Sequence, residues 1–257
     1  MNTVNLLINT QQRKLGAEIM KAQNPLGILF DSGCTKKLSL QIVCNEIDGS
    51  QSYSLKDLHS AGKFVEERCS RGHGVSVVAT SFATIPEACR LGGHIGFVWA
   101  DIRYACNPQL LRPFPQTREH AEQLLQKFPL PPSLTLHTQG LIQSFWLLRR
   151  PIVTKSETER MRAKILVTRV QDYFSAAATE DYWEYESTCD LNHRIILSRR
   201  GTEPTQPLEV ASVLEVRPDF RYSARDIVTA CNAGHDCCKE NWNARFPRKS
   251  SNRGDNK

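Results

Sequence analysis

The 257-residue chain lacks any apolar run that approaches the ~20 residues of a membrane-spanning helix. Its start, MNTVNLLINTQQRK, lacks the basic start and the small-residue cleavage site of a secretory signal. These absences argue against a membrane protein and against a secreted one, and they predict a cytoplasmic protein with no membrane partner. Hydrophobic residues make up 40% of the chain and charged residues 23%, which is ordinary for a globular protein long enough to bury a core.

Several motifs of enzyme and metal sites are missing as well. The sequence has no phosphate-binding glycine loop, no dinucleotide-fold glycine fingerprint, no Gly-x-Ser-x-Gly elbow and no His-Glu-x-x-His. It also has no paired Cys-x2-4-Cys knuckles, and its nine cysteines, an odd number, are expected to be free thiols. We therefore favour free thiols and a surface histidine over zinc at the remaining cysteine–histidine spacings. These spacings are Cys69-x3-His73, Cys189-x3-His193 and Cys231-x3-His235-x-Cys237-Cys238.

The charge of the chain is moderately basic, with a net charge of +6 and a pI of about 8.9. Such a balance is compatible with nucleic-acid binding, although many enzymes are equally basic. The basic residues cluster in three groups: Arg149 and Arg150; Arg160, Arg162, Lys164 and Arg169; and Arg194, Arg199 and Arg200. Two interpretations stay open, a solvated face without a partner and a surface that contacts phosphates, and the position of the clusters beside the segments described below favours the second.

The spacing of apolar residues predicts an alternation of helices and strands without repeats or linkers. Helices are expected at 13–22, at 55–67 with Ser54 as N-cap, at 116–128 with Thr117 as N-cap, at 156–177 with a capping box of Ser156 and Glu159, and at 224–233 with Ser223 as cap. Strands are expected at 26–30, 39–44, 75–79, 95–100, 134–136, 142–148, 194–197 and 208–215. This order predicts one α+β domain over residues 1–246, a mixed β-sheet with packed helices, and a disordered basic tail at 247–257.

Two segments in the middle of the chain contain the most informative pattern. The apolar run Ile95–Trp99 predicts a buried strand that ends at Asp101. Later, a Pro-Pro-Ser step leads into an apolar strand at Leu134–Leu136, a small-residue turn at 138–140, and a second strand at Ile142–Leu148. A third segment, TCDLNHRIILSRRGTEP at 188–204, places Asp190 before a strand and is followed by RYSARDI at 221–227.

In this order the segments resemble the catalytic half of the archaeo-eukaryotic primase superfamily, in its primase-polymerase and plasmid RepB-like branches. There an Asp-x-Asp strand end is followed by a Pro-Pro-Ser hairpin and then by a segment with an acid, arginines and a Gly-Thr turn. The resemblance implies a primase-polymerase-like core and template-directed nucleotidyl transfer with Mg²⁺ or Mn²⁺. Two such ions are held by carboxylates in this chemistry. The implied metal ligands are Asp101 and Asp190, with Asp181 as a rival for the third acidic position.

The chain departs from the superfamily pattern at two positions. Arg103 stands where the second acid of Asp-x-Asp would be, and an arginine cannot ligate a cation. Gln143 stands where the superfamily has a histidine that contacts the nucleotide triphosphate, a position at which RepB-like primases also have Gln. An alternative without function is that Asp101 and Arg103, which share a face of the strand, form an ion pair.

The resemblance also implies which residues contact the nucleotide and its phosphates. Catalytic roles would fall to Asp101, Asp190 and Gln143, and phosphate contacts to Arg103, Thr138, Gly140, Gln143, Arg194 and Arg199. The implied partners are single-stranded DNA as template, a nucleoside triphosphate and a replicative helicase.

Three hypotheses about function follow. The first is a RepB-like primase that starts replication of a plasmid, phage or other mobile element. The second is a catalytically inactive primase fold kept as a DNA-binding, replication-associated protein, in which Arg103 replaces the charge of a metal. The third is an unrelated α+β protein. Convergence of Asp101, Asp190 and one more carboxylate, from Asp181, Glu184 or Glu186, would favour the first, and Arg103 in their place would favour the second.

Overall fold

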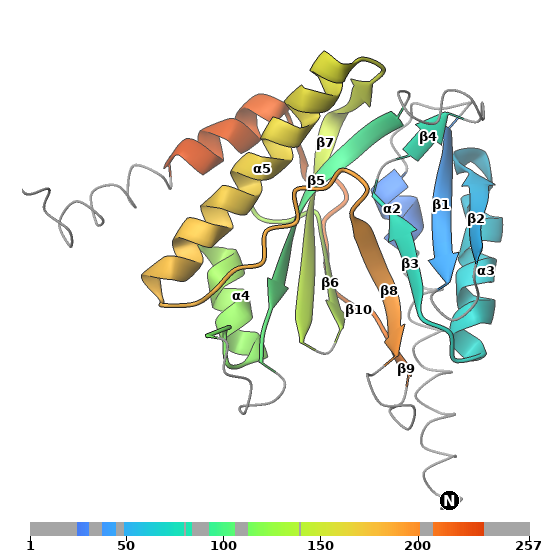
Figure 1. The fold of residues 1–257 in the computed structure, drawn as a ribbon, viewed down its shortest axis with the longest axis horizontal. Coiled ribbons are helices and arrows are strands. Elements are labelled where there is room, and N and C mark those ends of the chain that lie inside the picture. The colour runs from blue at the N-terminus through green and yellow to red at the C-terminus, as the bar shows by residue number, and fades with distance from the viewer. Residues whose placement is uncertain are drawn as a thin grey trace, which may run out of the picture.

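The computed structural model describes residues 25–30, 38–44, 49–79, 81–83, 93–105, 113–138, 140–200 and 208–233. Within these residues the strands form one 11-stranded sheet that is antiparallel except where β11 pairs with β7, and helices pack against it (Figure 1). The predicted α+β class with a mixed sheet is confirmed. The expected helix at 13–22 and the tail at 247–257 lie outside the described residues.

Strands are present at the expected positions from 39–44 to 208–215, and three further short strands, at 49–54, 81–83 and 221–222, were not expected. In chain order the strands are β1 (Leu38–Cys44), β2 (Gly49–Ser54), β3 (Val75–Val78), β4 (Ser81–Ala83), β5 (Gly93–Arg103), β6 (Leu134–Thr138), β7 (Leu141–Thr154), β8 (Arg194–Arg200), β9 (Leu208–Val210), β10 (Ser212–Val216) and β11 (Arg221–Tyr222). The strand expected at 208–215 is interrupted at Ala211, whose N–H donates to the carbonyl of Leu197.

The helices are α2 (Pro25–Phe30), α3 (Leu58–Ser70) after a 3-10 turn at Leu55–Asp57, α4 (Arg118–Gln126) and α5 (Glu157–Glu180), and residues 224–233 are also helical. The structure confirms Thr117 as N-cap of α4 and the capping box of Ser156 and Glu159 at α5. Two expectations were wrong. Residues 26–30 form a helix rather than a strand, and α3 is capped by Asp57, not by Ser54.

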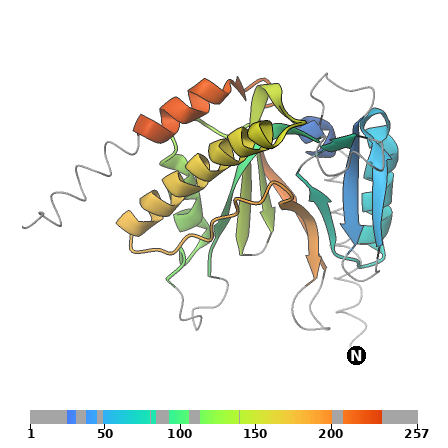
Figure 2. The same ribbon diagram turned by 45° about the horizontal axis from the view of Figure 1, so that its top comes forward.

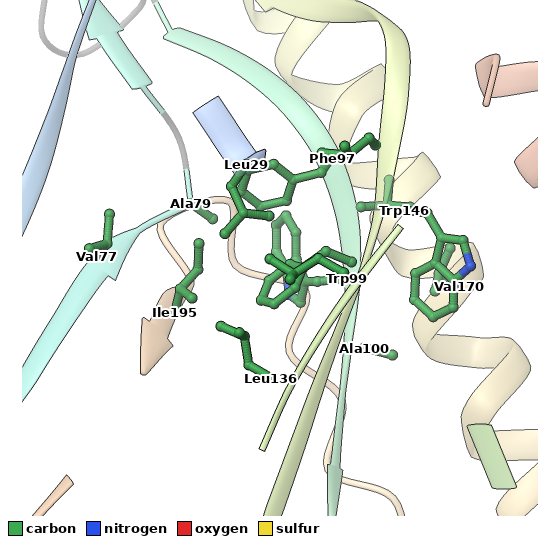
Figure 3. Packing of buried hydrophobic residues seen from close by; sticks show 14 of the residues in the cluster. Leu29, Val77, Ala79, Phe97, Trp99, Ala100, Leu136, Trp146, Val170 and Ile195 are labelled. Carbon is green, nitrogen blue, oxygen red and sulfur yellow. The ribbon is translucent and has the colours of Figure 1, made fainter. Parts of the chain in front are cut away.

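The core consists of two layers on either side of β5 and β7. Figure 3 shows Trp146 beside Val170 of α5 on one side, and Trp99 with Leu29 and Ile195 on the other. Because side chains alternate along a strand, neighbouring residues of β5 enter opposite layers. The helix-covered layer is rich in aromatic rings, most of which meet edge to face or tilted, and the second layer lies between β5 and β8.

The sheet curls until its two edges meet. Its strand order is β10-β6-β7-β5-β4-β1-β3-β8-β9, so β9 and β10 lie at opposite ends of the path although only Ala211 separates them in sequence. The N-terminal strands β1 to β3 therefore lie beside the hairpin of β6 and β7, with β8 between them in both views (Figures 1 and 2). This curl brings β8 over the face of β5 and β7 on which the predicted site residues lie. No helix among the described residues is long and apolar enough to cross a membrane.

Candidate functional site

Asp101 and Gln143 lie directly opposite each other near the ends of β5 and β7. The Gln143 amide donates to Asp101 Oδ1 at 3.2 Å, and its carbonyl oxygen accepts the N–H of Ile196 in β8 at 2.8 Å. Both side chains therefore lie on one face of one sheet, and both are buried, Asp101 at 7% exposure and Gln143 at 1%. Gln143 joins β7 to β8 across the curl of the sheet.

His193 covers the carboxylate of Asp101 from the other side. Its Nε2 lies 3.0 Å from Asp101 Oδ2, outside the alignment of a hydrogen bond. Its ring stacks on Trp99, with ring centroids 5.3 Å apart and planes within 10°. Trp99 and Asp101 are alternate residues of the same strand and so point to the same face. The buried carboxylate therefore lies between an amide donor and an imidazole that an indole holds in place.

The segment between α5 and β8 positions this histidine along the open edge of β5. The indole N–H of Trp99 donates to the backbone and the hydroxyl of Thr188, and the Gln171 amide donates to the carbonyl of Trp99 at 2.6 Å. Gln171 in turn accepts the hydroxyl of Tyr185 at 2.7 Å. Burial, and then the charge of Asp101, raises the pKa of Tyr185 well above its ordinary value of 10.0, so this phenol stays a neutral donor.

Arg103 lies at the exposed rim of the site. Its Nε is 2.8 Å from Glu186 Oε2, and both side chains are well exposed. The ion pair considered for it with Asp101 was wrong, because Asp101 faces His193 and Gln143. Arg103 also does not take the place next to the carboxylate that the second hypothesis assigned to it. An exposed pair such as Arg103–Glu186 contributes about 0–1 kcal/mol.

The remaining acids do not converge on Asp101. Asp190 is exposed, accepts the N–H of Asn192, and lines a separate cavity of about 180 Å³ beside the first turns of α5. Asp181 pairs with Lys127 at 2.6 Å. Among the described residues no group of three or more histidine, cysteine, aspartate or glutamate side chains could hold a metal. The surroundings of Asp101 thus supply one carboxylate, which does not fit the paired-carboxylate site that two Mg²⁺ or Mn²⁺ ions need.

The residues predicted to contact phosphate are spread along the structure. Thr138 and Gly140 form the turn between β6 and β7, where Gly140 has φ 78° and the buried Thr138 hydroxyl has no hydrogen-bond partner among the described residues. Arg194 and Arg199 are both exposed, at opposite ends of β8. Since a strand rises about 3.3 Å per residue, they stand about 17 Å apart, too far to hold one triphosphate together.

His193 is the site residue that sequence reasoning missed. The sequence placed it only in a Cys-x3-His spacing, and nothing local connects it with Trp99 or Asp101, which precede it by two helices and two strands. The one usable signal is its position at the start of the strand that follows Asp190. His193 contacts Trp99 and Asp101 only because the sheet curls and brings β8 over the face of β5 and β7.

The sequence matches no family model and no curated protein sequence. The fold is similar to three solved structures. The AEP domain of the primase-polymerase of cyanophage S-2L matches with a TM-score of 0.47 and 12% identity, over 76% of this chain and 89% of that one. The catalytic domain of primase RepB′ in complex with initiator DNA matches with 0.45 and 10%, over 88% and 97%. A structure of primase RepB′ matches with 0.43 and 11%, over 85% and 65%. At identities of 10–12% the likeness to these structures concerns the fold alone.

Proposed function

We propose that the chain is a DNA-binding, replication-associated protein with a primase-like fold, in which Gln143 and His193 rather than metal ions contact Asp101. One observation supports this most. The carboxylate is buried and meets the amide of Gln143 and the imidazole of His193, while Asp181, Glu186 and Asp190 are engaged elsewhere. A buried carboxylate with such neighbours helps to join β5, β7 and β8 and is not an open ligand for a cation.

DNA binding is supported by the charge of the chain and the placement of its arginines. Arg149 and Arg150 are exposed on β7, and Arg194 and Arg199 are exposed on β8. The spacing of the last two suits successive points on a nucleic-acid backbone better than a single triphosphate. Exposed guanidinium groups on a chain with a net charge of +6 attract phosphates over the screening length of physiological salt.

A second candidate is a working RepB-like primase that adds nucleotides on single-stranded DNA to start replication of a plasmid, phage or other mobile element. The observation that favours it is the strand-end position of Asp101 opposite Gln143, which is the arrangement that the resemblance implies. In that case Asp101 would be the residue here to hold Mg²⁺ or Mn²⁺ beside the nucleoside triphosphate, and His193 would have to leave the carboxylate.

One experiment separates the two candidates. Binding of a labelled single-stranded oligonucleotide is measured by fluorescence anisotropy over a salt series, and primer synthesis and extension are assayed on the same DNA with Mg²⁺ and with Mn²⁺. The wild-type chain is compared with Asp101→Asn, which preserves the shape of the side chain. Arg199→Ala reports on phosphate contact at β8.

We expect salt-dependent binding, no nucleotide incorporation, and the same affinity for Asp101→Asn. Arg199→Ala should reduce the slope of log affinity against log salt by about 0.7 for the one phosphate it contacts on a single strand. Robust incorporation that Asp101→Asn abolishes would establish the second candidate instead. Binding that is absent at low salt, or indifferent to salt, would refute the proposed function.

A further inference from the structure

A well-exposed aromatic side chain lies in the turn between β10 and β11. Phe220 is 40% exposed, and the guanidinium of Arg217 lies over its ring at 5.3 Å from the centroid. An exposed ring on a turn offers an apolar surface on which another π-system can stack. Arg217 also pairs with Glu215, which fixes its guanidinium beside the ring.

The turn is held rigidly from several sides. Its first residue, Arg217, donates its N–H to the carbonyl of Ser133 at 2.7 Å, and the Ser133 hydroxyl donates to the carbonyl of Phe220. Phe220 itself donates its N–H to the carbonyl of Arg217 at 3.0 Å, and Arg149 donates to the carbonyl of Arg221 at 2.8 Å. The ring is therefore presented on an ordered backbone, which lowers the entropy lost when something stacks on it.

A cavity of about 530 Å³ opens beside this turn, and Arg217 lines it. Its other walls include Phe128, Pro131, Pro132 and Leu214, and its charged residues form two ion pairs, Arg118 with Glu122 and Arg217 with Glu215. Thr135 also lines it and is adjacent in the pleat to Leu136, whose partner is Gln143, so the cavity lies on the opposite face of the sheet from Asp101. The charges of the cavity therefore balance. The positive charge beside the exposed ring comes from Arg149 and Arg150, which are exposed on β7, and Arg149 donates to the carbonyl of Arg221, the residue after Phe220.

We propose that Phe220 and the arginines beside it on β7 form a binding site for an unpaired base of a single-stranded nucleic acid, separate from the Asp101 site. The base stacks on the exposed ring of Phe220, and the neighbouring phosphates contact the exposed Arg149 and Arg150 of β7. Every base has a π-face, so the site accepts any sequence. The inference rests on the proposed DNA binding. It adds a contact with a base, which the phosphate contacts alone do not provide.

The test compares a short oligo-deoxythymidine with an abasic oligonucleotide that has the same number of phosphates. Anisotropy at low salt is measured for the wild type, Phe220→Ala, Phe220→Leu and Tyr182→Ala. Tyr182 is the matched control, because it is an aromatic residue with 79% exposure at the end of α5. Melting temperatures of all four proteins show that each one folds.

We expect the wild type to prefer the oligo-deoxythymidine, and Phe220→Ala to weaken that ligand by about 5- to 150-fold while leaving the abasic one unchanged. Phe220→Leu should resemble Phe220→Ala, since leucine keeps apolar area without a π-face, and Tyr182→Ala should match the wild type. Equal affinity of the wild type for both ligands, or no selective loss in Phe220→Ala, would overturn the base site and leave the proposed DNA binding intact. Absence of binding to either ligand would overturn both. A preference for bases that does not respond to salt would refute the phosphate contacts but support the base site.

Discussion

Replacing Gln143 should weaken the whole fold, because its amide joins three strands. The side chain is 1% exposed, donates to Asp101 at 3.2 Å and accepts from the backbone of Ile196 at 2.8 Å. Gln143→Met keeps the length and the apolar stem but leaves a buried carboxylate oxygen and a backbone N–H without these partners. Each loss costs about 1–3 kcal/mol, so the free energy of unfolding should fall by about 2–6 kcal/mol. That is a large part of the roughly 5–15 kcal/mol of an ordinary domain.

Gln143→Glu separates the two halves of this interaction. The variant keeps an acceptor for Ile196 but places a second carboxylate against Asp101, and like charges at that distance raise the pKa of the introduced carboxyl above its unfolded value of about 4.3. The folded state then binds more protons than the unfolded state between the two pKa values. Stability relative to the wild type should therefore be greatest at low pH and decrease as the pH rises through the raised pKa.

Urea denaturation followed by tryptophan fluorescence measures both effects, since the buried Trp99 and Trp146 report on the core around the site. Gln123→Met, on the exposed face of α4, is the matched control and should stay within about 0.5 kcal/mol of the wild type. If Gln143→Met costs no more than Gln123→Met, or the deficit of Gln143→Glu does not depend on pH, the amide does not hold the strands together as argued.

Three further predictions follow from the structure. Arg103→Asp removes a positive charge from the rim and places an acid two residues from Asp101. Calorimetry should therefore detect a higher Mg²⁺ affinity than in the wild type. No gain would disprove the alignment of Asp101 and Arg103 with the Asp-x-Asp of the superfamily. Ser156→Ala removes the N-cap of α5 and should lower the unfolding free energy by about 1 kcal/mol in urea titrations. Burial raises the pKa of Cys69 to about 11, so this thiol stays protonated at pH 8; peptide mapping after alkylation of the folded chain should find Cys189 labelled and Cys69 unlabelled.

Most elements of the fold could be predicted from local sequence because each has a local cause. The alternating and apolar runs of β1, β5, β6 and β7, and the caps at Thr117 and Ser156, depend on neighbours a few residues away. The error at 26–30 has the opposite origin. A six-residue apolar segment does not distinguish helix from strand by periodicity, and Pro25, which suits the first position of a helix, suggested a break instead.

The candidate site was likewise predictable only where its contacts join neighbouring strands of the chain. The sequence by itself determined that Asp101 ends a buried strand and that Gln143 follows a tight turn at Gly140, and antiparallel pairing of adjacent strands is enough to bring these two together. Only the tertiary structure decided what surrounds the carboxylate. The curl of the sheet lays β8 and the segment before it across the hairpin, which sets His193 on Trp99 and leaves Asp190 facing α5. Such contacts join residues far apart in the chain through the packing of whole strands, and no local pattern of side chains encodes them.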